Sequence, residues 1–108
     1  MIQVKGNDIS ISYRDTFDLI FNIVGFEIEE TDRIIFTIKD ELFDEAPIIR
    51  EEFTGLSGTS INIVVSSEEM KKLKLGTNYY DLLCVKNDNK VTLNFPAKLI
   101  VEKVVHNE

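Results

Sequence analysis

The sequence predicts an all-β protein, an immunoglobulin-like antiparallel β-sandwich of about seven to nine strands with one short helix. Apolar and polar residues alternate with a period of two along several short segments, which is the pattern of half-buried strands. Turn-forming residues separate these segments at fairly regular spacing, and one segment carries helix signals. Short strands at such spacing favour a sandwich over a fold that alternates strands with helices.

The clearest predicted strand runs from Phe17 to Ile23, where Asp18 and Asn22 lie opposite the apolar residues and Gly25 ends the segment. The other predicted strands, in chain order, are Ile9 to Tyr13, Arg33 to Lys39, Ile48 to Phe53, Ser60 to Val65, Tyr79 to Lys86, Val91 to Phe95 and Lys98 to Val105. The Asn-Asp-Asn sequence after Lys86 predicts a tight hairpin, because Asn and Asp tolerate the positive φ that such turns require.

A helix is predicted from about Ser67 to Leu75. Ser66 and Glu69 have the Ser-x-x-Glu spacing of a capping box, in which each side chain satisfies the other residue's free backbone donor. Gly76 follows at the position where a helix end favours the left-handed conformation.

This helix joins two predicted strands and is expected to form a structural corner. Met70 and Leu73 fall on one helix face and would close the open end of the sandwich. In immunoglobulin-type sandwiches, a helical turn at this place precedes a strand whose early tyrosine bonds back to the backbone. Tyr80 fits that place, and Leu82 and Cys84 would complete its inward-facing set.

Length and composition limit the classes of function. The 108 residues suit a single domain, residues 1–108, and 44% apolar residues can form a core without disulfides. No apolar run approaches the roughly 20 residues that cross a bilayer. The N-terminal residues lack the pattern of a secretory leader. We therefore expect synthesis in the cytoplasm and no membrane partner.

The charge balance argues against nucleic acid as a partner. Twelve basic and nineteen acidic residues give a net charge of −7, whereas phosphate backbones are bound mainly by Lys and Arg. The one basic cluster, Lys71, Lys72 and Lys74, directly follows Glu68 and Glu69, with which it would pair on a helix.

The sequence predicts neither an enzyme nor a cofactor or metal site. Cys84 is the single cysteine and has apolar neighbours, so it is interpreted as a buried hydrophobe. His106 is the single histidine, and chain ends are usually too poorly ordered to hold a general base. The acidic runs Asp40 to Glu45 and Glu27 to Asp32 lack the spacing of a calcium loop and are interpreted as solvated.

Aromatic residues near predicted strand ends allow an alternative role, because ring faces stack on sugars. The candidates are Tyr13, Phe26, Phe43, Tyr79 and Phe95. Most of them are expected to plug the ends of the sandwich instead.

The last predicted strand suggests an interface. Both of its faces carry apolar residues, including Ile100 and Val104 on the expected outer face, whereas a strand with one solvated face should be polar at alternate positions. Ile20 and Val24 suggest the same from the other half of the chain. We expect self-association, as a homo-oligomer, or docking through these residues, unless the helix or a loop covers them.

The segment Gly76 to Leu82, followed by a polar hairpin and a final strand, resembles a Gly-x-Tyr-x-Tyr-Asp-Leu motif. That motif belongs to the small immunoglobulin-like domains of bacteriophage tail and baseplate proteins, especially the N-terminal domain of upper baseplate proteins from phages of Gram-positive bacteria. Upstream, Asp15 to Phe17 matches the Gly-Asp-Thr-hydrophobic motif of these domains, and Ile35 to Asp40 matches their strand rich in Phe, Thr and Ile.

Two departures stand out. The first tyrosine after Gly76 is Tyr79, one residue later than in the motif, and Arg14 replaces the upstream glycine. The resemblance implies a phage or prophage virion component without catalytic residues, whose partners are other tail or virion proteins or copies of itself. The main alternative is a stand-alone β-sandwich binding module for carbohydrate or a host protein, and an enzyme is the third possibility.

Overall fold

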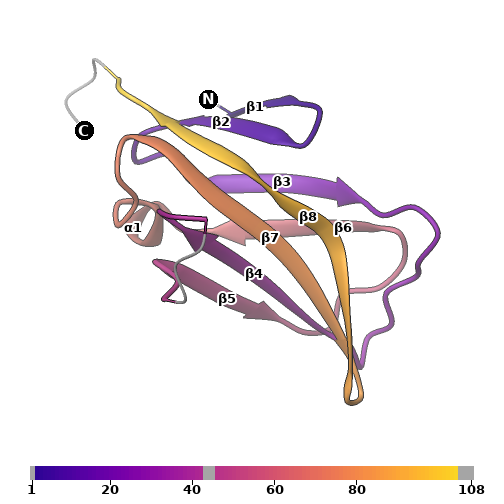
Figure 1. The fold of residues 1–108 in the computed structure, drawn as a ribbon. Coiled ribbons are helices and arrows are strands. Elements are labelled where there is room, and N and C mark those ends of the chain that lie inside the picture. The colour runs from indigo at the N-terminus through magenta and orange to yellow at the C-terminus, as the bar shows by residue number, and fades with distance from the viewer. Residues whose placement is uncertain (1, 43–45, 105–108) are drawn as a thin grey trace.

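The computed structural model describes residues 2–42 and 46–104, except for the side chains of residues 94–96, and its strands form two packed sheets (Figure 1). The elements in chain order are β1 (Ile2–Lys5), β2 (Asp8–Ser12), β3 (Phe17–Asn22), β4 (Arg33–Lys39), β5 (Ile49–Phe53), β6 (Ser60–Val65), α1 (Ser67–Met70), β7 (Gly76–Lys86) and β8 (Asn89–Glu102). The predicted all-β sandwich with one short helix is confirmed.

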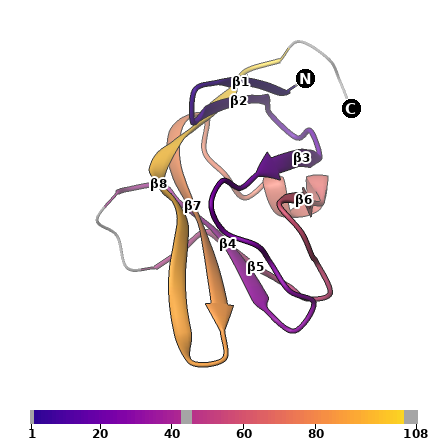
Figure 2. The same cartoon turned by 90° about the vertical axis from the view of Figure 1, so that its right-hand side faces the viewer.

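The larger sheet has six strands in the order β1-β2-β8-β7-β4-β5, and the smaller sheet contains β3 and β6. In immunoglobulin domains, strands C, F and G share one sheet and strands B and E the other. Here β4, β7 and β8 occupy the first set of places, and β3 and β6 the second. Seen end-on in Figure 2, the larger sheet curves around the smaller one.

Strand pairing departs from the expected antiparallel arrangement at one place. Neighbouring strands are antiparallel except β2 and β8, which run parallel with Ile9 beside Leu99 and Ile11 beside Val101. A parallel pair cannot be joined by a tight hairpin. It is possible here because β2 joins the larger sheet beside the last strand and the chain then crosses to β3.

Most predicted strands lie within a few residues of the observed ones, but two predictions were wrong. β1 was not predicted at all, and the two predicted C-terminal strands are one continuous strand, β8. Between the pairs Tyr80–Ala97 and Leu83–Thr92, β8 uses five steps against three in β7. These register shifts make room in the strand for Pro96, which has no N–H to donate. Val105 lies outside the described residues.

The helix is shorter than predicted. α1 ends at Met70, and the amides of Lys72 and Leu73 bond three residues back to Glu69 and Met70 in a tighter turn. The prediction of a helix to Leu75 was therefore wrong, because the chain turns after Met70 and enters β7 at Gly76. Gly76 does adopt a positive φ of 96°, but as the first residue of β7 and not as a helix cap.

The capping residues behave partly as predicted. Ser66 is the N-cap, and its hydroxyl accepts a hydrogen bond from the Glu69 amide at 3.3 Å. The Glu69 carboxylate instead accepts from the ammonium of Lys72 at 2.9 Å. Met70 and Leu73 are both buried and pack into the core, as expected for a corner that closes the sandwich.

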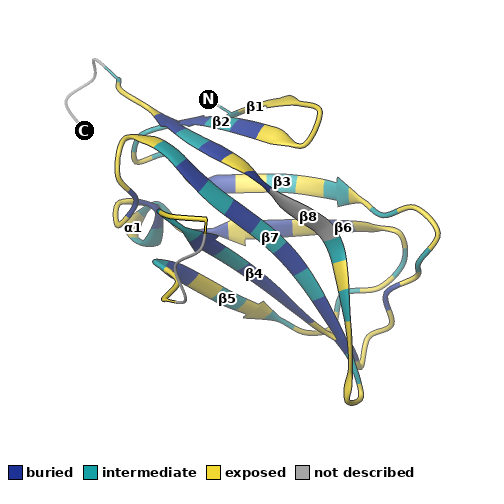
Figure 3. Cartoon of the chain, in the orientation of Figure 1, coloured by how far each residue is buried: buried dark blue, intermediate teal, exposed yellow. Residues whose placement is uncertain are grey.

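The core lies between the two sheets (Figure 3). Its largest fully buried side chains are Phe17, Phe36, Ile9, Ile11, Ile28, Ile34, Ile38, Ile49, Ile61, Ile63, Leu82 and Leu99. The rings of Phe17 on β3 and Phe36 on β4 have centroids 5.0 Å apart, so an aromatic contact joins the two sheets.

Tyr80, Leu82 and Cys84 are all buried on the inward face of β7, as predicted. The Tyr80 hydroxyl donates to the carbonyl of Asn7 at 2.5 Å. The expected bond to the nearby corner is thus replaced by one to the β1–β2 turn, at the other end of the chain. Burial, with a smaller contribution from the charge of Asp8, raises the pKa of Tyr80 to about 12.

Candidate functional site

The outward face of the six-stranded sheet has the features of a binding surface. Register places Ile35 of β4 beside Leu83 of β7, and Leu83 beside Thr92 of β8. Val85 lies next along β7, between Arg33 and Lys90. Although they point away from the core, Ile35 and Val85 are only 7% and 4% exposed. This row of side chains forms the apolar centre of what we call the docking face.

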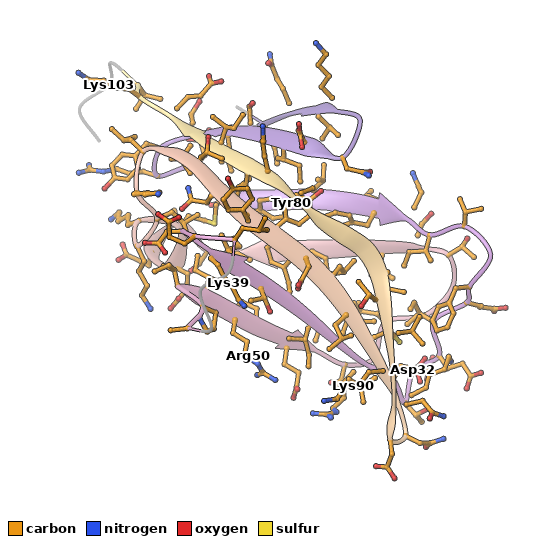
Figure 4. The ribbon with its side chains drawn as sticks, in the orientation of Figure 1. Asp32, Lys39, Arg50, Tyr80, Lys90 and Lys103 are labelled. Carbon is orange, nitrogen blue, oxygen red and sulfur yellow. The ribbon has the colours of Figure 1, made fainter. Side chains whose placement is uncertain are left out.

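Basic side chains surround this apolar centre. Arg33, Lys39, Arg50 and Lys90 come from three strands and, with the apolar residues, line a depression of about 340 Å³. Figure 4 labels Lys39, Arg50 and Lys90. Long basic side chains can cover apolar surface with their methylene groups while the charge stays in water. That property accounts for the low exposure of outward-pointing apolar residues.

Two carboxylates moderate the positive charge of the docking face. Glu52 of β5 lies 2.9 Å from the guanidinium of Arg33 and 3.8 Å from that of Arg50. Burial raises the pKa of Asp81 above its usual range, and the nearby charge of Lys39 partly opposes this. The four cations still outnumber the two carboxylates, on a chain whose net charge is −7.

A second depression, of about 640 Å³, lies on the same sheet near the β1–β2 hairpin. Ile100, one of the predicted interface residues, lines it together with Val4 and Ser10. Ile100 is half-buried and pairs with Thr77 on one side and Ser10 on the other. The structure therefore extends the outward face of β8 toward the N-terminal hairpin.

The four predicted interface residues do not form one surface. Ile20 is 61% exposed and points outward from the two-stranded sheet, on the opposite side of the sandwich from Ile100. Val24 follows β3 and is 95% exposed. Val104 is half-buried just beyond the end of β8. The apolar centre of the docking face was missed, although the apolar run Leu82 to Val85 indicates a strand covered on both faces.

A buried ion pair lies at the opposite end of the sandwich from α1. Asp32 is 4% exposed and accepts hydrogen bonds from the Lys86 ammonium at 2.6 Å and from the Glu29 amide at 2.9 Å. These two bonds hold the pKa of Asp32 below its usual range, and the pair raises the pKa of Lys86. The Lys86 ammonium also lies 5.3 Å above the ring of Phe26. The expectation that the run Glu27 to Asp32 is solvated throughout was therefore wrong.

The Asp32–Lys86 pair also affects the neighbouring Cys84. Burial raises the pKa of the Cys84 thiol, and the charge of Asp32 adds to that effect. A thiol with a raised pKa is a weak nucleophile. Cys84 is buried, as predicted.

The remaining predicted features are spread over the surface. Tyr13 and Phe26 are half-buried in two different connecting segments and Tyr79 is half-buried on β7, whereas the side chains of Phe43 and Phe95 lie outside the description. In the first acidic run Asp40 and Glu41 are described, and Glu41 lies 4.0 Å from Lys74. Within residues 2–42 and 46–104, no cluster of three or more acidic, His or Cys side chains could hold a metal ion.

Among the described residues, the helix is α1, and it is too short to cross a membrane. The fold and the docking face thus define a two-sheet β-sandwich with an apolar, basic-rimmed sheet face. No protein family, curated protein or solved structure was found to match the chain.

Proposed function

We propose that this protein is a non-catalytic assembly module whose docking face binds another protein. The resemblance of Gly76 to Leu82 and Asp15 to Phe17 to phage tail and baseplate domains supports a more specific form of the proposal. In that form the module is built into the tail or baseplate of a phage or prophage particle.

The observation that carries this proposal is the composition of the docking face. Protein interfaces combine a desolvated apolar centre with a polar rim, and Arg is enriched in them. Ile35, Leu83 and Val85 supply such a centre, and Arg33 and Arg50 lie at its rim. An antiparallel sheet face that meets only water is usually polar at these positions.

The surroundings of the perturbed titratable groups support a non-catalytic role. Asp32 and Lys86 are paired with each other, and Cys84 and Tyr80 are buried in the core. A general base or nucleophile must reach a substrate within hydrogen-bonding distance. These four groups are committed to packing and internal hydrogen bonds.

Purified phage particles test the proposal directly. Particles are collected after induction in the bacterium that carries the gene, and are examined by immunoblot and by immunogold electron microscopy with antibodies to the chain. We expect label at one end of the tail. Complete recovery of the chain in the particle-free fraction would contradict the tail assignment and leave the stand-alone binding module as the alternative.

Variants of the docking face test the binding surface separately. Lys90→Glu reverses an exposed rim charge, and Leu83→Asp places a carboxylate in the apolar centre. Both should lower incorporation into particles at least tenfold, and Lys90→Glu should do so without a large change in melting temperature. Ile20→Asp, an exposed apolar residue of the other sheet, is the matched control and should be incorporated normally.

A further inference from the structure

The two-stranded sheet leaves backbone groups without strand partners. β3 and β6 pair in register from Phe17–Val65 to Asn22–Ser60, and just beyond them the Ile23 amide donates to the Thr59 carbonyl at 2.7 Å. In an antiparallel pair, residues alternate between those that bond to the opposite strand and those whose N–H and C=O groups point to the other edge. Because Ile23 bonds to Thr59, this alternation places the backbone N–H and C=O groups of Ser60, Asn62 and Val64 on the side of β6 that faces away from β3.

β6 therefore has a free edge in the described part of the chain, where its strand neighbour is β3. Natural proteins protect free edges with charges, proline or bulges. The sequence of β6, Ser-Ile-Asn-Ile-Val-Val, contains no charge, proline or glycine. Four of its six residues are Ile or Val, which have high β-propensity. Short uncharged segments of this kind are typical of strands that pair with further strands. Ser60, Asn62 and Val64 are all exposed.

The other sheet edges are protected. β5 carries Arg50, Glu51 and Glu52 within five residues, and β1 is four residues long with Lys5 at its end. β3, the other edge of the small sheet, carries Asp18. Among the strands of residues 2–42 and 46–104, the β6 edge is thus the sheet edge that lacks a charge, so it is the one suited to pair with another strand.

We propose that β6 pairs antiparallel with β6 of a second copy of this chain, about a two-fold axis at Asn62. The free backbone groups are symmetric about Asn62, so the pairing places Asn62 opposite Asn62 of the second copy and Ser60 opposite its Val64. This register forms about six main-chain hydrogen bonds, two for each hydrogen-bonded pair. It merges the two small sheets into one sheet of four strands and covers Val64, which is 45% exposed.

The net charge of −7 on each copy does not prevent this pairing, because the nearest like charges at the edge stay far apart. Asp18 lies beside Val64 in the small sheet. In the proposed pair, Val64 is followed by Ser60 and then Asn22 of the second copy, so the two Asp18 carboxylates are at least three strand spacings apart, about 14 Å. The Debye length at physiological salt is about 8 Å. The repulsion between these carboxylates is therefore largely screened.

The proposed contact is edge-to-edge and closes after two copies, because a two-fold contact uses the same surface on both. It leaves the docking face uncovered. It is also independent of the proposed function, since a monomeric chain could still bind a partner through the docking face.

Light scattering coupled to size-exclusion chromatography tests the pairing with the full chain. We expect a dimer at tens of micromolar and a monomer for Asn62→Lys, which places two ammonium groups opposite each other at the axis. Asn62 is exposed, so this variant should remain folded, with a melting temperature that does not depend on protein concentration. Ile20→Lys is the matched control. It should remain dimeric, because Ile20 is one strand away from the edge, whereas a face-to-face contact through Ile20 would be lost.

Cysteine cross-linking tests the register. Paired residues at a hydrogen-bonded site have Cα atoms about 5.5 Å apart, within the range of a disulfide. Asn62→Cys should form a disulfide-linked dimer under mild oxidation. Ser60→Cys alone and Val64→Cys alone should not, whereas an equimolar mixture of these two variants should form a disulfide-linked dimer. The single native cysteine, Cys84, is buried and provides the background. A monomeric wild-type chain, or equal cross-linking at all three positions, would overturn the proposal.

Discussion

The two sheets of this protein differ most at their edges and on their outward faces. The six-stranded sheet ends in strands that carry charge, and its outward face combines Ile35 and Val85 with a basic rim. The two-stranded sheet has one edge with no charge, and its outward face exposes Ile20 and Val64 among small polar residues. One core therefore supports two kinds of surface, one suited to a charged protein partner and one suited to another strand.

In the core, the two sheets are joined by the contact between the rings of Phe17 and Phe36. Removing either ring should have the largest effect on stability. Phe17→Ala and Phe36→Ala should each cost about 3–5 kcal/mol in the free energy of unfolding, because both rings are fully buried. Since the ring centroids are 5.0 Å apart, the double variant should differ from the sum of the two by about 0.5–3 kcal/mol. Urea unfolding of the four chains measures this coupling. Strict additivity would mean that the sheets are stabilised independently.

The corner that links the sheets should be almost as sensitive. Leu73→Ala is expected to cost about 2–5 kcal/mol, because Leu73 is buried where the chain passes from the smaller sheet to the larger one. Lys72→Ala is a suitable control at the neighbouring exposed position, and should cost less than about 1 kcal/mol. A urea midpoint for Leu73→Ala equal to that of wild type would show that this turn does not close the core.

Much of this comparison could be predicted from the sequence, because alternation is a local signal. β4 and β6 begin and end at the predicted residues, and Met70 and Leu73 are buried as expected. What failed depends on contacts between distant segments. β1 has only four residues, Ile-Gln-Val-Lys, so its alternation of apolar and polar residues is too short to identify a strand. Its place in the sheet depends on the pairing of β2 with β8.

The predictions for the polar residues were wrong for the same reason, because these residues contact distant segments of the chain. Asp32 reads as one more acidic residue in a solvated run, and it is buried because Lys86, 54 residues further along the chain, reaches it. Tyr80 bonds to Asn7, 73 residues away. Of the docking face, the apolar run Leu82 to Val85 was visible in the sequence, but the arrangement of Arg33, Arg50 and Lys90 around it requires the strand order.

The Asp32–Lys86 pair connects the end of β7, in the larger sheet, to the loop between β3 and β4. The pKa of Asp32 is lowered from 3.8 in the folded protein, so the pair stabilises the fold above that value and this contribution is lost as the pH falls through the folded pKa. Asp32→Asn should lower the urea midpoint at pH 7. The gap between variant and wild type should narrow as the pH falls below about 4. A gap that is constant from pH 7 to pH 2 would rule out this role for the carboxylate.

Tyr80 connects the core of the larger sheet to its N-terminal hairpin, with a smaller expected effect. Tyr80→Phe should cost about 1 kcal/mol at neutral pH, for the loss of one buried hydrogen bond. Because its pKa is raised to about 12, Tyr80 stabilises the fold fully below about pH 10 and loses that contribution as the pH rises toward 12. The variant should therefore lose less stability than wild type over this range. Denaturant midpoints at several alkaline pH values measure the difference.

The edge of β5 allows the smallest change in stability and the sharpest test of the comparison. The pair of Arg33 and Glu52 is partly exposed, so replacing Arg50 and Glu52 with Thr and Val should change the free energy of unfolding by about 1 kcal/mol or less. The same change removes two edge charges. We expect new concentration-dependent association in sedimentation velocity, additional to any pairing through β6. Unchanged association would show that these charges do not protect the edge.

The parallel pairing of β2 with β8 also bears on how the polypeptide can be re-engineered. Ile2 pairs with Ile11, and Ile11 with Val101, so the first and last strands of the described chain meet at one pole of the sheet, about two strand spacings or 10 Å apart (Figure 1). A flexible linker of a few residues can span that gap. The chain should therefore tolerate circular permutation, with new ends opened in the Asn87–Asp88 turn at the opposite pole. Proteins fused before Ile2 or after Glu102 would leave from the same pole and keep that turn unobstructed.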